Sequence, residues 1–159
     1  MTQIDYRELE GAITPPLLHD LAAVAVAIFT GEQEPGARVE GYAEQLQTEL
    51  NGYRWVHLCL AYQGDRIVGY KVGRSNDPRS FESWGGGVLA QARRQGIANE
   101  LAARQEAWVQ AKGFGYLTTL VAHDNQPMLI VNLKRGFCVA GTQVTRGEHR
   151  KVLLEKAMP

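Results

Sequence analysis

The amino-acid sequence predicts an α/β fold of the α+β kind, with a mixed, mostly antiparallel central sheet of about seven strands flanked by four helices. Two observations carry this prediction. Helical patterns interrupt a series of short, strand-like apolar runs in the order β-α-α-β-β-β-α-β-α-β-β. Only residues 81–121 have the strand–helix–strand order of a parallel crossover. At 159 residues the chain has the usual size of one domain, which we expect to span residues 1–159.

The first elements expected are one strand and two helices. Residues 3–9 roughly alternate apolar and charged side chains, as a half-buried strand does. A helix then begins after Thr14, a residue type that caps helix N-termini, and ends near residue 30. Residues 32–36 are expected to form a loop, and residues 39–50 a second amphipathic helix.

The later elements are mostly strands. Residues 54–74 hold two β-rich runs joined at Gln63-Gly64-Asp65-Arg66, which has the length and composition of a tight hairpin. After this hairpin we expect a strand at 80–90, a helix at 98–112, a strand at 116–122, a helix at 128–134, and strands at 137–144 and 151–154.

Composition and charge favour a small-molecule partner. Lys+Arg and Asp+Glu both number 17, so nothing in the charge balance indicates a nucleic acid or an anionic membrane surface. The two cysteines, Cys59 and Cys138, lack the spacing of a zinc site or a disulfide framework, and no metal is expected. The N-terminus has no signal-peptide pattern and no run reaches membrane-spanning length, so we expect a soluble cytoplasmic protein.

The stretch QARRQGIANEL, residues 91–101, places two arginines and a glycine where a strand gives way to a helix. The first turn of a helix has unpaired N–H groups and about half a positive charge, so it attracts anions. Arg93 and Arg94 add full charges, and Gly96 lets an anion such as a diphosphate approach the backbone. From the residues alone, solvated arginines beside a glycine turn explain the pattern equally well.

Two motifs resemble one known family. RRQGIA, residues 93–98, matches the Arg/Gln-x-x-Gly-x-Gly/Ala signature of the GNAT superfamily, the acetyl-CoA-dependent N-acetyltransferases. NQPMLIVNLKRGF, residues 125–137, resembles the family's second signature, an Asn followed by a short helix and a Lys-x-Gly-Phe ending. The element order resembles the GNAT fold along nearly the whole chain, whereas residue-level similarity is confined to 81–142 and looks most like an uncharacterised bacterial branch.

The resemblance implies an N-acetyltransferase that moves the acetyl group of acetyl-CoA directly to a primary amine of a small molecule or peptide. A CoA-binding module with lost or weak catalysis is the alternative. The family's habit also implies a homodimer.

The resemblance also implies which residues bind CoA. The residues implied to hold the CoA pyrophosphate are Arg93, Arg94, Gln95, Gly96, Ile97, Ala98 and Asn99. The strand edge implied to bind the pantetheine arm and the acetyl carbonyl is Gly86, Gly87 and Val88. The Asn125 side chain is implied to contact the pantetheine, with helix capping as its rival role.

Catalysis is less well defined by the resemblance. Glu82 lies where several members carry a glutamate base, although a surface carboxylate at a strand edge is the competing interpretation. Asn132 stands where the family usually has the tyrosine that protonates the CoA sulfur, and an amide cannot take that role. Asn132 could hydrogen-bond the sulfur or the pantetheine instead. The proton would then come from water, or the thiolate would leave unassisted.

Other candidates are weaker. His57 and Cys59 share one face of a strand, which permits a Cys/His nucleophile but is more often core packing. His123 is the most favourable histidine for catalysis. The acceptor is expected to contact residues 29–42, where Glu32 and Glu34 either attract a cationic amine or keep a loop soluble.

Residues 85–90 also spell a dinucleotide-binding fingerprint, G-x-G-x-x-A. That motif should end a strand and open a helix directly, with an acidic residue about 20 positions further on at the end of the next strand. The helix here begins later, and Glu106 lies inside the helical pattern. A nicotinamide- or flavin-binding protein is therefore the least favoured of the three hypotheses.

Overall fold

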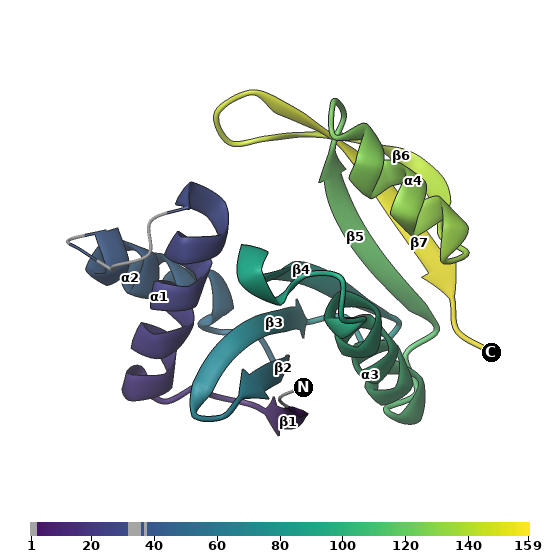
Figure 1. The fold of residues 1–159 in the computed structure, drawn as a ribbon. Helices are drawn as coiled ribbons and strands as arrows, with labels where there is room; N and C mark the ends of the chain where they lie inside the picture. Colours follow the sequence, from purple (N-terminus) through teal and green to yellow (C-terminus); the bar gives the residue numbers. More distant parts are fainter. Residues whose placement is uncertain (1–2, 32–35, 37) are drawn as a thin grey trace.

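The computed structural model describes residues 3–31, 36 and 38–159. Within these residues seven strands form one sheet in the order β1-β2-β3-β4-β5-β7-β6 (Figure 1). The elements are β1 (Ile4–Glu10), α1 (Pro15–Thr30), α2 (Arg38–Leu50), β2 (Trp55–Gln63), β3 (Arg66–Ser75), β4 (Ser80–Val88), the short 3₁₀ helix η1 (Ala90–Ala92), α3 (Ile97–Ala111), β5 (Tyr116–Ala122), α4 (Gln126–Lys134), β6 (Cys138–Thr145) and β7 (His149–Ala157). Among the described residues, no helix is long and apolar enough to span a membrane.

The pairing pattern confirms the predicted fold class. Every neighbouring pair of strands is antiparallel except β4 and β5, which run parallel on either side of the crossover through α3. The hairpin between β2 and β3 also forms at the predicted residues. The mixed, mostly antiparallel sheet with four helices therefore follows from the element order in the sequence.

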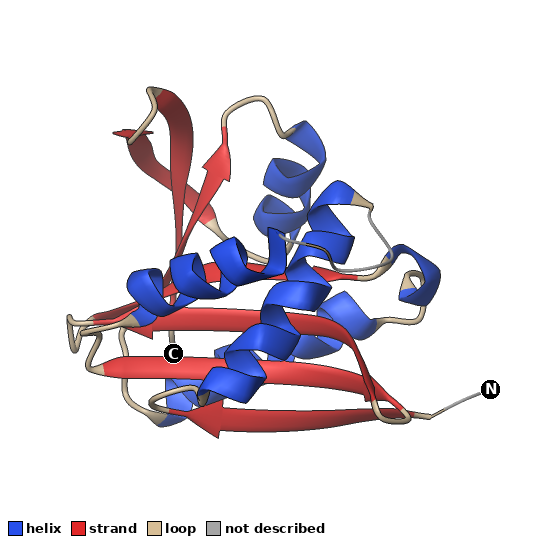
Figure 2. Cartoon of the chain, turned by 90° about the vertical axis from the view of Figure 1, so that its left-hand side faces the viewer, coloured by secondary structure: helices blue, strands red, loops and turns tan. Residues whose placement is uncertain are grey.

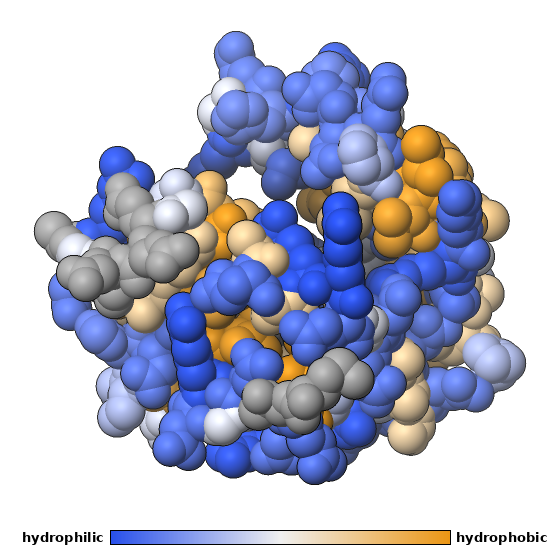
Figure 3. All heavy atoms as spheres, viewed as in Figure 1, coloured by the Kyte–Doolittle hydropathy of each residue, from blue (hydrophilic) through white to orange (hydrophobic). Residues whose placement is uncertain are grey.

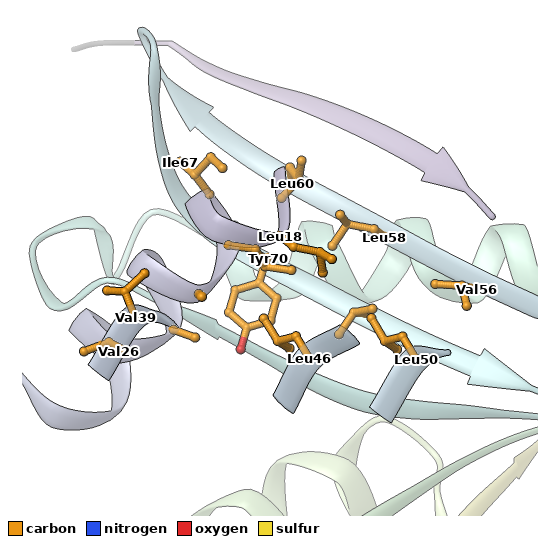
Figure 4. Close-up of a cluster of buried hydrophobic side chains, with 14 residues drawn as sticks. Leu18, Val26, Val39, Leu46, Leu50, Val56, Leu58, Leu60, Ile67 and Tyr70 are labelled. Atoms are coloured by element: carbon orange, nitrogen blue, oxygen red, sulfur yellow. The ribbon is translucent and has the colours of Figure 1, made fainter. Parts of the chain in front are cut away.

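The helices cover both faces of the sheet. Along β2, Leu58 and Leu60 are buried in the cluster under α1 and α2, whereas Cys59 and Ala61 are buried in the cluster under α3. Successive strand residues point to opposite faces, so two helical layers bury one continuous apolar strand. Figure 4 shows the first of these clusters, in which the α1 and α2 side chains meet those of β2 and β3.

The sheet opens between β4 and β5. These strands pair only where Ser80–Glu82 lie beside Tyr116–Thr118, and β4 continues to Val88 without β5 as a partner. A bulge on β4 accompanies the opening, because Val72 and Gly73 of β3 are opposite Gly85 and Ser83, which leaves the residue between them unpaired. Figure 2 shows the upper ends of β5–β7 turned away from the remaining strands.

Several element boundaries differ from the sequence prediction by one or two residues, and the ends of β4 and β7 have a clear structural cause. The strand predicted to run to residue 90 ends at Val88, since Leu89 donates its N–H to Val68 and the chain then enters η1. The last strand is longer than the predicted 151–154 because β7 pairs with β5 on one side and β6 on the other. Pairing on both edges keeps charged residues such as Glu155 in the strand, although apolar periodicity did not predict a strand there.

A cleft between the diverging strands β4 and β5

A cavity of about 400 Å³ lies where β4 and β5 diverge. Its wall includes Gly85–Val88 of β4, Ala98 and Gln105 of α3, and Thr119–Ala122 of β5. Asn125 and Asn132 contribute from the α4 side. In the space-filling view, the surface is hollowed between the β6–β7 hairpin and the α1 side of the molecule (Figure 3). The sequence therefore brings its predicted strand edge, helix start and second signature to one cleft.

The start of α3 presents a run of free backbone donors. Among the described residues, no group accepts a hydrogen bond from the backbone N–H groups of Arg94 to Asn99, and the first such bond of the helix is from Glu100 to the carbonyl of Gly96. Gly96 itself has a φ of 75°, the left-handed conformation that glycine adopts without strain. Free amides and the positive end of the helix dipole make this turn suited to an anion.

Three cationic side chains surround this turn. Arg93 Nε donates a hydrogen bond to the carbonyl oxygen of Val88 at 3.3 Å, which ties the loop to the end of β4. Arg94 has a φ of 66°, so the loop holds a non-glycine residue in the left-handed region. Arg135, which follows α4, donates to Oδ1 of Asn99 and so connects α4 to the first turn of α3. Two arginines thus belong to this turn, and a third, Arg135, contacts it and lines the cleft.

The glycines of β4 are required by close packing. A Cβ atom at Gly86 would stand 2.9 Å from the carbonyl oxygen of Tyr70 on β3. At Gly87 it would stand 2.9 Å from a methyl carbon of Ile28 on α1. On its other edge β4 has no ladder partner beyond Glu82 within the described residues. This edge is open for backbone hydrogen bonds to an extended ligand.

The two asparagines of the second signature have local hydrogen bonds. Asn125 caps α4, its side-chain Oδ1 accepting from the N–H of Met128 at 3.3 Å. Asn132 Nδ2 donates to the carbonyl oxygen of Met128, one turn earlier, at 2.9 Å. Both residues also line the cavity. The capping role considered for Asn125 is thus present in the structure together with a place in the cleft.

Glu82 lies beside the cleft rather than in its wall. Its carboxylate forms an ion pair with Arg74 at 3.7 Å, and Arg74 also bonds to Glu49 at 3.0 Å. The guanidinium of Arg74 stacks over the rings of Tyr53 and Trp84. Glu82 therefore has a cationic partner in Arg74. The role of Glu82 as a catalytic base stays a prediction.

Two polar residues of the cavity, one half-buried and one fully buried, were not predicted from the sequence. Lys71 lies on β3, and burial, together with the Arg135 guanidinium, lowers the pKa of its ammonium to about 8. Gln105 on α3 is fully buried, and neither Nε2 nor Oε1 has a partner among the described residues. A lysine in a strand and a glutamine in a helix give no signal in sequence, since both are ordinary surface residues.

The remaining sequence candidates lie outside the cavity wall. His57 is fully buried, stacks on Trp108 at 4.5 Å, and bonds through Nε2 to Glu8 at 2.9 Å. Burial raises the pKa of Cys59 to about 12, so its thiol is a poor nucleophile. His123 follows β5, with its backbone N–H bonded to the carbonyl of Arg150 at 3.2 Å. The contacts of His57 and the burial of Cys59 favour packing roles, whereas His123 is exposed.

Three other sequence expectations concern the dinucleotide fingerprint, a metal site and the acceptor segment. The glycine run that spells a dinucleotide fingerprint lies inside β4, not at a turn from a strand into a helix. Within the described residues, no group of His, Cys, Asp and Glu could hold a metal, and both cysteines are free. Glu32 and Glu34, considered for acceptor attraction, lie outside the described residues, whereas Phe29 of the same segment lines the cavity.

Comparisons with solved structures show the same fold. A protein assigned to the GNAT family from Desulfovibrio desulfuricans is 13% identical with a TM-score of 0.75, covering 98% of this chain and 99% of the other. The ribosomal-protein-S18-alanine N-acetyltransferase from Escherichia coli is 10% identical with a TM-score of 0.72, covering 96% and 94%. The PaiA N-acetyltransferase from Thermoplasma acidophilum, solved in complex with coenzyme A, is 16% identical with a TM-score of 0.66, covering 98% and 99%.

Sequence comparison identifies the family directly. No curated protein sequence matches the chain. The family model described as "Acetyltransferase (GNAT) family", however, matches residues 21–137, which include the free amides of α3, the glycines of β4 and the whole second signature. With the seven-stranded sheet that opens between β4 and β5, this match shows that the chain belongs to the acetyltransferase (GNAT) family.

Proposed function

We propose that the protein transfers the acetyl group of acetyl-CoA directly to a primary amine of a small molecule or peptide. One observation carries the proposal: the backbone N–H groups of Arg94 to Asn99 are free, and this run includes Ala98, which lines the cleft together with the glycines of β4. Such a run of amides suits a diphosphate, and the cleft suits an extended arm. The binding of coenzyme A by the PaiA structure supports the choice of ligand.

The residues present fit the parts of this ligand. Arg93 and Arg94 supply positive charge beside the amides that would hold the pyrophosphate. The open edge at Gly86, Gly87 and Val88 offers backbone groups to the pantetheine amides and the acetyl carbonyl. A carbonyl that accepts from a fixed N–H group is stabilised as negative charge develops on its oxygen. Asn125 closes the other side of the cleft.

The acceptor amine has to be neutral to attack the carbonyl carbon. In our proposal Glu82, or a water molecule beside it, takes up the proton that the amine releases. Glu82 directly precedes Ser83, which lines the cleft, and its carboxylate pairs with Arg74 at 3.7 Å. The acceptor approaches from the α1 side, where Phe29 and Trp84 contribute apolar wall.

The alternative is a CoA-binding module with weak or lost catalysis. Two contacts favour it: Asn132 already donates its amide proton to Met128, and Glu82 already pairs with Arg74. A module of this kind binds CoA as tightly as an enzyme does but acetylates no amine. Binding and turnover therefore have to be measured separately.

Binding is tested by thermal unfolding and calorimetry with acetyl-CoA, CoA and NADH. We expect both CoA species to stabilise the protein and NADH to leave it unchanged. An Arg94→Glu, Gly96→Glu double variant, which puts two carboxylates at the pyrophosphate position, should lose the stabilisation. If saturating acetyl-CoA did not change the melting temperature of the wild type, the proposed function would have to be abandoned.

Turnover is tested with a broad panel of primary amines and N-terminal peptides, followed by the release of free CoA thiol. Acetylation of one class of amine, lost in Glu82→Gln and retained in an exposed-carboxylate control such as Glu148→Gln, supports the enzyme. Tight binding of CoA without turnover of any amine would support the binding module instead.

A further inference from the structure

Lys71 reaches the cleft from a neighbouring strand. It lies on β3 opposite Gly86 of β4, and a Cβ atom at Gly86 would stand only 3.4 Å from both Cα and Cγ of Lys71. Because Gly85, Gly86 and Gly87 have no side chains, nothing on β4 separates Lys71 from the cavity, and Lys71 forms part of its wall. The topology thus brings an amine from β3 into the opening between β4 and β5.

The Lys71 ammonium has no partner in the part of the chain that the structure describes. Burial and the Arg135 guanidinium on the α4 side lower its pKa to about 8. Glu106, which lines the same cavity from α3, is paired with Lys156 at 2.6 Å. Cys59, opposite Lys71 on β2, carries a buried thiol whose pKa is raised to about 12. Among the described residues that line the cavity, no carboxylate is therefore free to pair with this cation.

Gln105 adds a second unpartnered polar group to the same cavity. Its side chain is fully buried, with 0% exposure to solvent. Both amide atoms lack a hydrogen-bond partner among the described residues. Buried polar groups are nearly always satisfied, by protein, water or ligand. An amine and an amide left unpaired in one cavity indicate that a polar part of a ligand lies there.

The proposed acetyl transfer is easier with a proton donor near the CoA sulfur. Cleavage of the thioester leaves a thiolate, whose conjugate thiol has a pKa of roughly 8.5. Asn132 lines the cavity but its amide cannot act as an acid, and Nδ2 already donates to Met128 at 2.9 Å. The family's usual donor is therefore missing, while an unpaired ammonium lines the same cavity.

We propose that Lys71 supplies the proton that the CoA sulfur takes up when the thioester is cleaved. This inference rests on the proposed function. The acceptor nitrogen forms a bond to the carbonyl carbon, the C–S bond breaks, and the sulfur keeps its electron pair and takes a proton from Lys71 Nζ. The acceptor nitrogen releases one proton to Glu82 or water, and the neutral Lys71 amine regains a proton from solvent. The sum is one amide and one thiol.

The acidity of Lys71 suits this step better than that of its neighbour Tyr70. Proton transfer is most effective when the donor and the acceptor have similar pKa values near the working pH, and about 8 is close to that of a thiol. Burial raises the pKa of Tyr70 further above its ordinary value, so the phenol is a weaker acid. Its ring also packs in the cluster under α1 and α2 (Figure 4).

The complex with CoA tests the proposal without an acceptor. Thiolate formation is followed by its ultraviolet absorbance against pH, for free CoA and for CoA bound to wild type, Lys71→Met and Lys71→Arg, with affinity measured by calorimetry. A cation within about 4–6 Å lowers a neighbouring acid's pKa by about 1–3 units. We expect the bound thiol to ionise at least about one pH unit lower in the wild type than in Lys71→Met.

Turnover separates proton donation from charge alone. Arginine retains the positive charge but does not release a proton. In Lys71→Arg the bound thiol should therefore ionise at the same pH as in the wild type, while the rate of acetyl transfer stays as low as in Lys71→Met. For Lys71→Met and Lys71→Arg we expect kcat to fall by about 10²- to 10⁴-fold with little change in KM for acetyl-CoA. Lys112→Met, at the far end of α3 and paired with Glu10, is the matched control and should behave as wild type.

Three results would overturn the proposal. The first is an unchanged thiol pKa in Lys71→Met with CoA bound to both proteins. The second is a Lys71→Arg variant as active as the wild type, which would make the charge sufficient. The third is a wild type that binds no CoA, which would overturn the proposed function itself and this inference with it.

Discussion

At the residue scale, Arg94 combines strain with charge. Arg94 and Glu148 are the two non-glycine residues with positive φ in the described chain, at 66° and 62°. A left-handed conformation costs about 1–2 kcal/mol for a residue with a side chain, which exceeds the roughly 0.5–1 kcal/mol of extra chain entropy that glycine brings to the unfolded state. The loop therefore holds an arginine where glycine would be more stable.

We predict that Arg94→Gly raises the free energy of unfolding by roughly 0.5–1 kcal/mol and weakens CoA binding by less than about tenfold. The backbone donor remains, and only the cation is lost, so the salt dependence of binding should become shallower. Denaturant unfolding and calorimetry at two salt concentrations measure both effects. Glu148→Gly should give the same stabilisation without a change in affinity, and a loss of stability in both variants would contradict the strain argument.

His57 makes stability depend on pH. Burial lowers its pKa, which the hydrogen bond and charge of Glu8 only partly offset. Below about pH 6.5 the unfolded chain binds a proton that the folded protein does not, so stability falls as pH decreases from about 6.5 toward the folded pKa. The slope for one such proton is at most about 1.4 kcal/mol per pH unit.

We predict that His57→Phe, which keeps a ring against Trp108, flattens the decline of the unfolding free energy between about pH 7 and pH 5. Urea denaturation at several pH values measures the slope. The control is His149→Phe on β7, where the side chain is exposed. An identical slope in the wild type and His57→Phe would show that other groups, such as the carboxylates, cause the pH dependence.

At the element scale, the glycines of β4 differ in how closely neighbouring atoms pack against them. A Cβ atom at Gly85 would lie 3.5 Å from a methyl carbon of Val72, which is an ordinary van der Waals distance. A Cβ atom at Gly86 would lie only 2.9 Å from the backbone oxygen of Tyr70. A flexible side chain can move away from a new methyl group, but a strand backbone cannot. Gly85 therefore tolerates an added side chain better than Gly86 does.

We predict that Gly86→Ala lowers the free energy of unfolding by about 1–3 kcal/mol, because β3 and β4 have to move apart. Gly85→Ala should change it by less than about 1 kcal/mol, so it serves as the control on the same strand. Chemical denaturation measures both variants. Equal losses in the two would point to the entropy of the glycine run rather than to the contact with Tyr70.

The sequence predicted most elements and part of the cleft. Apolar periodicity located the helices and strands within a few residues, and the signature RRQGIA predicted the free amides at the start of α3. Lys71 and Gln105 could not be predicted in this way. Their place in the cavity depends on β3 lying beside β4, on glycines that leave the space open, and on α3 covering that face. Such relations belong to the tertiary structure and have no local pattern.

At the scale of the whole molecule, the sheet consists of two parts held together at one end. The strands β1–β4 pack under α1, α2 and α3, while β5, β7 and β6 carry α4, and the two parts share the three residue pairs between Ser80–Glu82 and Tyr116–Thr118. Phe81, Val109 and Leu154 add a common core below the opening. A ligand in the cleft would contact both parts and connect them above this core.

This arrangement predicts where CoA binding changes local stability. The helix α4 has no buried residue in its range and exposes apolar side chains such as Ile130 and Leu133, so few contacts hold it in the absence of a ligand. We expect saturating CoA to slow amide hydrogen exchange in α4 and in the first turn of α3, while β2, buried on both faces, changes little. Hydrogen exchange followed by mass spectrometry with and without CoA measures this directly. Because a ligand held by the α3 amides alone would protect only α3, bound CoA without added protection of α4 would contradict a cleft closed by both parts of the sheet.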